Sequence, residues 1–255
     1  MMRNLGQPLV LMYHGIGERS PAADPHNLFV PAGVLREQLT VLLRRGWRPL
    51  RLDDYLAGRG DRRSFMVTFD DGYRSVHQLG VPLLGELGVP ATVFILSGLF
   101  GGRSEWMPEM PAEPLMTAEE VLATRAGGFE LGLHGMDHTA LPGLPPHELR
   151  RQVRTAAQGL AELTGQWPRA FAYPYGDHDA AARSAVAAAG LDIAFATHDS
   201  DGPLAVPRVD VNATDSSATF RVKTLRSYTQ LRRLGGTVPG LRPAVRAVLG
   251  GVRSG

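Results

Sequence analysis

The apolar run from Phe65 to Phe69 ends in two adjacent carboxylates and a glycine, Asp70-Asp71-Gly72. This pattern predicts a buried strand that delivers both acids to its C-terminal end, the edge at which parallel α/β folds place their chemistry. Burying two neighbouring carboxylates is costly unless one of them binds a metal or carries a shifted pKa. For an isolated pair, the alternative is a strand-end turn in which aspartate only shapes the loop.

Two histidines, His134 and His138, follow a second predicted strand at 129–133. A spacing of four residues puts both on one face of a helix, and a tight loop can also bring them together. An arbitrary pair of this kind is more often on the surface or in the core. Joined by one aspartate from the earlier strand, they form a set that leaves coordination positions open, as in catalytic zinc sites and some iron sites. A non-haem iron oxygenase would need a His-x-Asp…His order on a β-helix, which the order here does not match.

The motifs resemble those of a known family, the polysaccharide deacetylases (the NodB-homology domain of carbohydrate esterase family 4). The likeness is greatest to the subgroup of exopolysaccharide (poly-N-acetylglucosamine) deacetylases. The segments that carry it cover about residues 8 to 215 and occur in the family's order. They are residues 68–72, 134–138 and 171–176, with weaker likeness at 11–14, 90–94 and 204–208.

The resemblance implies a distorted (β/α) barrel of about seven parallel strands. Apolar runs that alternate with helical periodicity independently predict a parallel α/β architecture. We therefore expect a catalytic domain at 1–215, followed by a basic, helical C-terminal tail at 216–255.

The activity implied by the resemblance is metal-dependent removal of acetyl groups from N-acetylated amino sugars of a polysaccharide, oligosaccharide or lipid-linked glycan. Asp71, His134 and His138 would hold the metal, and Asp70 would be the general base. The chain has no cysteine, so any metal must be held by His, Asp or Glu. The family favours Zn²⁺, and this ligand set also accepts Co²⁺, Ni²⁺ or Mn²⁺.

Two further catalytic roles are assigned by weaker matches. His14, which ends the first predicted strand, matches a Tyr-His pair of the subgroup and is our candidate general acid, with His198 as the alternative. Much of the family has an arginine at the position of Ala172. We expect Arg208 to supply that charge from a neighbouring strand, although it could equally be an ordinary exposed arginine.

The third motif and one loop supply candidate substrate-binding residues. Tyr175 and Gly176 are expected to shape the acetyl pocket, with the Tyr175 backbone N–H as oxyanion donor. Tyr173 and Pro174 are expected to be wall residues. Trp106, in an irregular loop, could stack on a sugar ring or only anchor its loop.

Two other functions stay open at this point. Relatives with this domain also hydrolyse small cyclic amides, and a degenerate relative could bind carbohydrate without turnover. The presence of both aspartates and both histidines argues against loss of activity.

Charge is unevenly distributed along the chain. From residue 216 to the end there are eight basic side chains and no acidic one. A solvated helical face explains such a run, and contact with an anionic membrane surface is the sharper hypothesis. We expect no nucleic-acid partner, because no aromatic-and-basic motif is present. With no signal peptide or membrane-spanning stretch recognised, the expected location is cytoplasmic or peripheral to the membrane.

Overall fold

The computed structural model describes residues 7–197, 202–225 and 228. The strands are β1 (Leu9–Tyr13), β2 (Gly15–Ile16), β3 (Phe29–Val30), β4 (Arg48–Pro49), β5 (Ser64–Phe69), β6 (Ala91–Ile95), β7 (Glu130–Leu133), β8 (Ala170–Ala172), β9 (Ile193–Ala196), β10 (Val206–Pro207) and β11 (Val209–Asp210). The α-helices are α1 (Ala32–Arg44), α2 (Leu52–Leu56), α3 (Val81–Leu87), α4 (Ala118–Ala126), α5 (Pro146–Arg150), α6 (Ala156–Thr164), α7 (Ala180–Ala188) and α8 (Ser217–Lys223).

All strand pairs in the large sheet are parallel, and the sheet is nearly closed on itself. Its order is β10-β9-β8-β7-β6-β5-β1-β11, with β4 added beside the start of β5. Strands buried on both faces read as continuous apolar runs, which is why β1, β5 and β6 were recognisable in the sequence. The predicted distorted (β/α) barrel is confirmed.

The barrel is closed by one short segment that belongs to both ends of the sheet. β10 pairs with β9, and β11, which begins two residues after β10 ends, pairs with β1. Arg208 lies at the break between the two strands, and its backbone N–H donates to the carbonyl of Ala196. The segment from β10 to β11 therefore joins the two ends of the sheet, and Arg208 is its middle residue.

Alternating side chains of the strands fill the interior of the barrel. Val10, Met66, Phe94 and Phe195 belong to this inner cluster, and Leu52 of α2 joins it. Helix α2 thus covers the N-terminal mouth of the barrel. The opposite, C-terminal mouth is left for the site.

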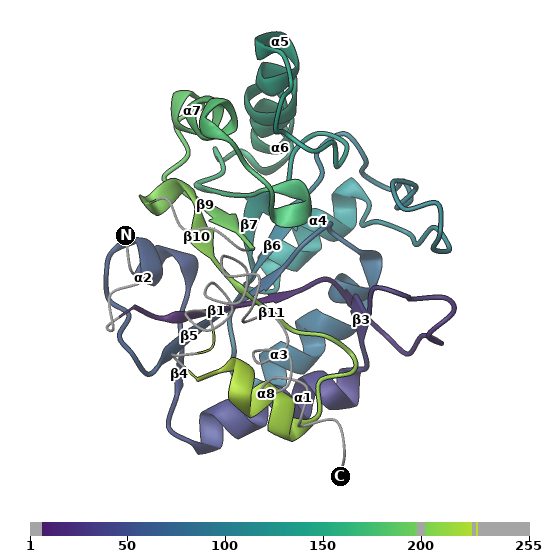
Figure 1. The fold of residues 1–255 in the computed structure, drawn as a ribbon, viewed down its shortest axis with the longest axis vertical. Coiled ribbons are helices and arrows are strands. Elements are labelled where there is room, and N and C mark those ends of the chain that lie inside the picture. The colour runs from purple at the N-terminus through teal and green to yellow at the C-terminus, as the bar shows by residue number, and fades with distance from the viewer. Residues whose placement is uncertain (1–6, 198–201, 226–227, 229–255) are drawn as a thin grey trace, which may run out of the picture.

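Helices cover the outside of the sheet on both sides. In Figure 1, α1, α3 and α8 gather on one side of the strands, and α5, α6 and α7 lie on the other. Their apolar faces pack on the outward side chains of the strands to form the larger core, which includes Leu39, Leu84, Val153 and Val186. A capping box begins α4: the Thr117 side chain accepts from the Glu120 backbone N–H, and the Glu120 carboxylate accepts from the Thr117 backbone N–H.

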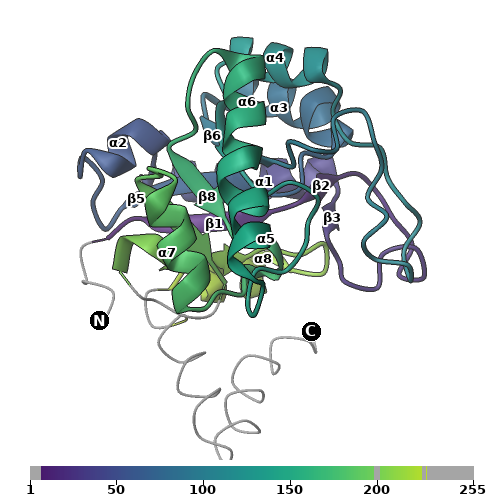
Figure 2. The ribbon, with the colours of Figure 1, turned by 90° about the horizontal axis from the view of Figure 1, so that it is seen from above.

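Two of the helical segments contain π-helical turns. The first is η1 (Val76–Gly80), which precedes α3, and the second is η2 (Arg151–Thr155), between α5 and α6. Backbone angles stay helical through η2, so α5, η2 and α6 are one continuous helix, seen as a single column in Figure 2.

The first part of the predicted basic tail packs on the barrel. Phe220 and Lys223 of α8 are buried, and Lys223 Nζ donates to the Asp215 carboxylate at 2.7 Å. Six of the eight basic residues of this tail, Arg226 and the five within 229–255, lie outside the described residues, so the membrane-surface hypothesis stays a prediction. None of the described helices is both long and apolar enough to cross a bilayer.

Candidate active site

Asp70 and Asp71 directly follow β5, and both lie at the C-terminal mouth of the barrel. Met66 and Thr68 of β5 point toward the interior, and Asp70, the residue directly after β5, continues this alternation. The chain then turns at Asp71, whose φ is 72°. Both carboxylates line one cavity.

Three buried side chains converge as the sequence predicts. Nε2 of His134 lies 3.1 Å from Asp71 Oδ1, and Nε2 of His138 lies 3.2 Å from the same oxygen. One ligand atom from each residue falls within 4.8 Å of the others, so the three can hold a metal ion together. His134 is placed by the sheet, because its N–H donates to the carbonyl of Ile95 at the end of β6.

The hydrogen bonding of these groups fits a cation. The Nδ1 atom of His134 lies 2.8 Å from the Ala172 carbonyl oxygen, so Nδ1 carries a proton and Nε2 is the ring atom that faces Asp71. Asp71 Oδ1 is buried and, among the described residues, has no partner of hydrogen-bonding geometry despite the two short contacts. A buried carboxylate oxygen that faces two imidazole nitrogens is an arrangement that a metal ion between them would satisfy.

Electrostatics at the site also favour positive charge. Burial by itself would lower the pKa of His134, but the carboxylates of Asp70 and Asp71 raise it overall. Burial would raise the pKa of Asp71, yet the two imidazoles hold that pKa well below its usual range. Burial lowers the pKa of His138 and so favours the neutral form that ligates metal.

Asp70 has its own partner and takes no part in the three-residue set. Both of its oxygens accept from Arg208, at 2.7 Å from Nη1 and 2.6 Å from Nη2. The guanidinium is buried, lies over the rings of Phe94 and Phe195, and also donates to Thr68 Oγ1. Burial would raise the pKa of Asp70, but Arg208 and then His134 lower it overall, so the carboxylate stays ionised.

A cavity of about 410 Å³ opens over these groups. Two loops form part of its rim: residues 17–28, after β2, and residues 96–116, after β6. An exposed contact joins His26 Nε2 to Glu109 Oε1 at 2.7 Å, and Arg19 pairs with Glu113 at 2.8 Å. Figures 1 and 2 both show the two loops projecting from the same side of the barrel.

Several predicted residues meet at this cavity. His14 follows β1, where the Tyr13–Phe69 register sets it opposite Asp70, and it is only partly buried. Trp106 stacks on the His138 ring at 4.5 Å between centroids, and Tyr175 meets the same ring edge-on at 4.5 Å. Gly176 also lines the cavity.

Two predicted wall residues lie elsewhere, and one alternative cannot be placed. Tyr173 is buried, and its hydroxyl donates to the Leu204 carbonyl at 2.9 Å, so its ring packs below the cavity. Pro174 is buried and is not part of the cavity lining. His198 lies outside the described residues.

Other lining residues were not singled out in the sequence. They lie on the rim loops, or in or just after the strands nearest the site, and they are Met12, His26, Leu28, Met107, Glu109, Thr197, Asp210 and Asn212. Asp210 and Asn212 had a usable signal, because polar residues at the end of an apolar parallel strand are candidates for a site. The residues of the rim loops had none.

Three non-glycine residues of the site have left-handed backbones: Asp71, His138 and Tyr175, with φ of 72°, 67° and 59°. This conformation costs a residue with a Cβ about 1–2 kcal/mol, and such strain clusters at functional sites. Asn27 is the other non-glycine residue with positive φ among those described. The surrounding structure must therefore hold these three residues in place.

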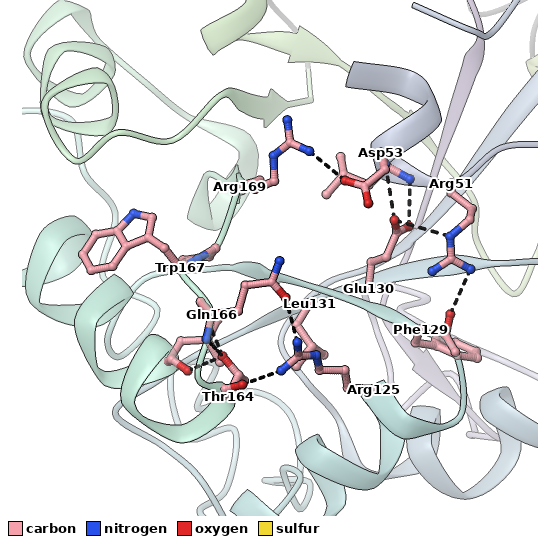
Figure 3. Close-up of a pocket in the computed structure, with 14 residues that line it drawn as sticks. Arg51, Asp53, Arg125, Phe129, Glu130, Leu131, Thr164, Gln166, Trp167 and Arg169 are labelled. Atoms are coloured by element: carbon pink, nitrogen blue, oxygen red, sulfur yellow. Dashed lines mark hydrogen bonds and ion pairs between the residues drawn. The ribbon is translucent and has the colours of Figure 1, made fainter. Parts of the chain in front are cut away.

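A second cavity, of about 250 Å³, lies at the other end of the barrel beside α2 (Figure 3). Arg169 pairs with Asp53 and Asp192, and Arg125 donates to the Thr164 carbonyl and to Gln166. Glu130 accepts from the first backbone N–H groups of α2. The charged residues of this second cavity therefore pair with one another or with backbone groups, and they hold α2 against the barrel.

Comparison with known proteins agrees with this geometry. The profile of the family described as "Polysaccharide deacetylase" matches residues 57–194, just over half of the chain. YxkH of Bacillus subtilis strain 168, a protein named for the same family, is 22% identical over 221 residues, which is 83% of this chain and 74% of YxkH.

Two solved structures share the fold over most of their length. The deacetylase PplD of Streptococcus pyogenes, solved with acetate, has a TM-score of 0.73 at 20% identity, covering 86% of this chain and 98% of PplD. IcaB from Ammonifex degensii has a TM-score of 0.71 at 25% identity, covering 88% of this chain and 97% of IcaB. With Asp71, His134 and His138 gathered at the mouth of a parallel barrel, the chain belongs to the polysaccharide deacetylase family.

Proposed function

We propose that this protein is a metal-dependent hydrolase that removes acetyl groups from N-acetylated amino sugars of a polysaccharide, oligosaccharide or lipid-linked glycan. One observation carries the proposal. A buried Asp-His-His set lies in the same cavity as a second aspartate that is kept ionised by its own arginine. Metal-assisted amide hydrolysis can use this division of labour, in which one acid holds the cation while another accepts a proton.

Asp71 and the Nε2 atoms of His134 and His138 would hold the divalent cation, for which we propose Zn²⁺. When bound, such a cation polarises a carbonyl and lowers the pKa of water. The remaining roles fall to groups of the chain itself.

Asp70 is the proposed general base. Arg208 favours its ionised form and fixes the plane of its carboxylate through two parallel hydrogen bonds. Each carboxylate oxygen still has lone-pair capacity beyond the bond it accepts from Arg208, so Asp70 can take a proton from the attacking water. Arg208 therefore acts on the reaction through Asp70 and does not need to touch the substrate.

His14 is the proposed general acid. It follows β1, opposite Asp70 in the register of β1 and β5, and it lines the cavity as a partly buried residue. An imidazole there can give a proton to the amine nitrogen as the C–N bond breaks. His198 is the competing candidate from the sequence.

The acetyl group and the sugar need a pocket of mixed character. Tyr175, Gly176 and Trp106 are proposed to enclose the acetyl group, with the Tyr175 backbone N–H as a donor to the developing oxyanion. Trp106 lies parallel to His138, so its ring also helps to fix that ligand. Glu109, Asp210 and Asn212 provide polar groups on the rim that suit sugar hydroxyls.

The test is acetate release from N-acetylglucosamine oligomers by metal-stripped protein, with and without added Zn²⁺ or Co²⁺. We expect metal-dependent release that Asp70→Asn abolishes while metal still binds. Asp192→Asn is a matched control, because Asp192 also pairs with an arginine, but at the far end of the barrel. Absence of release with every metal and acetylated sugar would refute the proposal, and ring opening of a small cyclic amide would identify the alternative chemistry.

A further inference from the structure

The helix α5–η2–α6 departs from α-helical geometry at one place, and that place contacts the loop between His134 and His138. A π-turn inserts one extra residue into a helix, and such turns are found disproportionately at functional sites. Gln152 lies within the turn and is fully buried. Its side chain does not line the cavity, and the proposed reaction gives it no role.

The Gln152 carboxamide bonds to the loop between the two histidines at two points. Its Oε1 accepts from the Met136 backbone N–H at 3.0 Å, and its Nε2 donates to Asp137 Oδ1 at 2.5 Å. Arg151, the preceding residue of the π-turn, donates to Asp137 Oδ2 at 2.8 Å. Asp137 in turn accepts from the N–H and hydroxyl of Thr139. The loop is thus fastened to the helix on both sides of Asp137.

The two histidines differ in how they are held. His134 extends from β7, and its Nδ1 is bonded to the Ala172 carbonyl. Nδ1 of His138 is buried and has no partner among the described residues. A metal-binding histidine ordinarily has its second nitrogen fixed by a hydrogen bond. The ring of His138 contacts Trp106 and Tyr175, and any further restraint on this residue must act through its backbone.

The backbone of His138 is held in an unfavourable conformation. Its φ of 67° is left-handed, and a free loop would relax from it. The residues on either side of His138, Asp137 and Thr139, are bonded to each other, and Asp137 is bonded to the π-turn. His138 thus lacks a hydrogen bond at Nδ1 among the described residues, and the hydrogen bonds of Asp137 restrain its backbone instead.

We infer that Gln152 is a positioning residue for the metal ligand His138, and that the π-turn exists to bring its carboxamide to the 135–139 loop. This inference rests on the proposed metal-binding function. It predicts that loss of the carboxamide weakens metal binding, because His138 then leaves its strained conformation more easily. Loss of an outer partner of a metal ligand typically costs about 10- to 100-fold in metal affinity.

The experiment compares full-length Gln152→Met with wild type. Methionine keeps the volume of the buried side chain and removes both hydrogen bonds. Affinity for Zn²⁺ is measured by competition with a chromophoric chelator, and ligand geometry by the absorption spectrum of the Co²⁺-loaded protein. We expect an affinity about 10- to 100-fold weaker and an altered Co²⁺ spectrum. Gln158→Met is the matched control, since Gln158 lies exposed on the same helix and its side chain donates to Glu162, away from the histidine loop.

The outcomes separate this inference from the proposed function. If wild type binds Zn²⁺ and Q152M binds it equally well with an unchanged Co²⁺ spectrum, Gln152 only fills space and the inference is wrong. If wild type binds neither metal, the proposed function fails and the inference with it. Should Q152M not fold, as judged by circular dichroism, Asp137→Ala removes the acceptor of the same carboxamide. Unchanged Zn²⁺ affinity in that variant also overturns the inference.

Discussion

Replacing Arg208 with methionine isolates the energy of the buried pair beneath the site. The substitution keeps an unbranched side chain between Phe94 and Phe195 but removes both hydrogen bonds to Asp70. It leaves a carboxylate with almost no exposure to water and without its arginine partner. Removing one partner of a buried ion pair costs about 3–5 kcal/mol, whereas neutralising both partners costs much less. We therefore expect Arg208→Met to lower the free energy of unfolding by about 3–5 kcal/mol.

The assay is urea unfolding of metal-free protein, because bound metal would add its own stabilisation. Asp70→Asn, Arg208→Met and the double variant form a double-mutant cycle. We expect the double variant to be at least as stable as Arg208→Met alone, since the uncompensated carboxylate is then gone. Arg169→Met is the comparison: Arg169 also pairs with two aspartates, but its side chain is 45% exposed. Exposed pairs contribute about 0–1 kcal/mol.

Two results would refute this reasoning. One is a loss for Arg208→Met no larger than that for Arg169→Met, which would mean that water or another group compensates Asp70. The other is strict additivity in the cycle, which would mean that the two side chains contribute independently despite distances of 2.6 and 2.7 Å.

Two smaller perturbations test the backbone and the helix caps. A Cβ at Gly176 would lie 2.0 Å from Thr197 Oγ1 at a φ of 75°, whereas at Gly88, with φ of 64°, it would meet nothing within 4 Å. Gly88→Ala should cost about 1–2 kcal/mol from the left-handed backbone alone, and Gly176→Ala should cost about 1–3 kcal/mol more from overpacking; equal unfolding free energies would contradict the steric argument. Backbone N–H groups of Ala182 and Gly143 lower the pKa of Asp179, the N-cap of α7, so its ionised form stabilises the fold above the ordinary pKa and that stabilisation is lost as pH falls through the lowered value. Asp179→Ala should therefore lower the free energy of unfolding by about 1 kcal/mol at pH 7 and by less near pH 3. Urea unfolding measures both values, and an equal loss at the two pH values would contradict a role for the charge.

A structural feature of this protein can be predicted from the sequence when it produces a recognisable pattern in neighbouring residues. A strand before His14 could be predicted because β1 is a run of five apolar residues. The cluster of Asp71, His134 and His138 could be predicted because a pair of aspartates that ends one strand and two histidines that follow another occur together in the order of a known family. Helix α2 was missed, since five residues are too few to show a helical period.

Features that depend on tertiary contacts left weaker patterns or none. The π-turn at Arg151–Thr155 has no compositional signature, so residues 146–164 read as one regular helix. Gln152 has the sequence context of a polar residue on an amphipathic helix, and only the structure shows that it is buried. Arg208 could be suspected from the family, but the sequence left it equally consistent with an exposed side chain. Its burial between two aromatic rings depends on how the ring closes.

The residue that closes the ring also carries the charge that keeps Asp70 ionised. Asp70, Asp71, His134 and His138 are all synthesised well before Arg208, and the segment matched by the family profile ends at residue 194. Until the strand around Arg208 docks between β9 and β1, Asp70 lacks the two hydrogen bonds that it accepts from that arginine. Closure of the barrel and pairing of Asp70 with Arg208 are therefore a single event. A chain that ended before this strand would retain the motifs at 68–72, 134–138 and 171–176 and lack the arginine that pairs with Asp70.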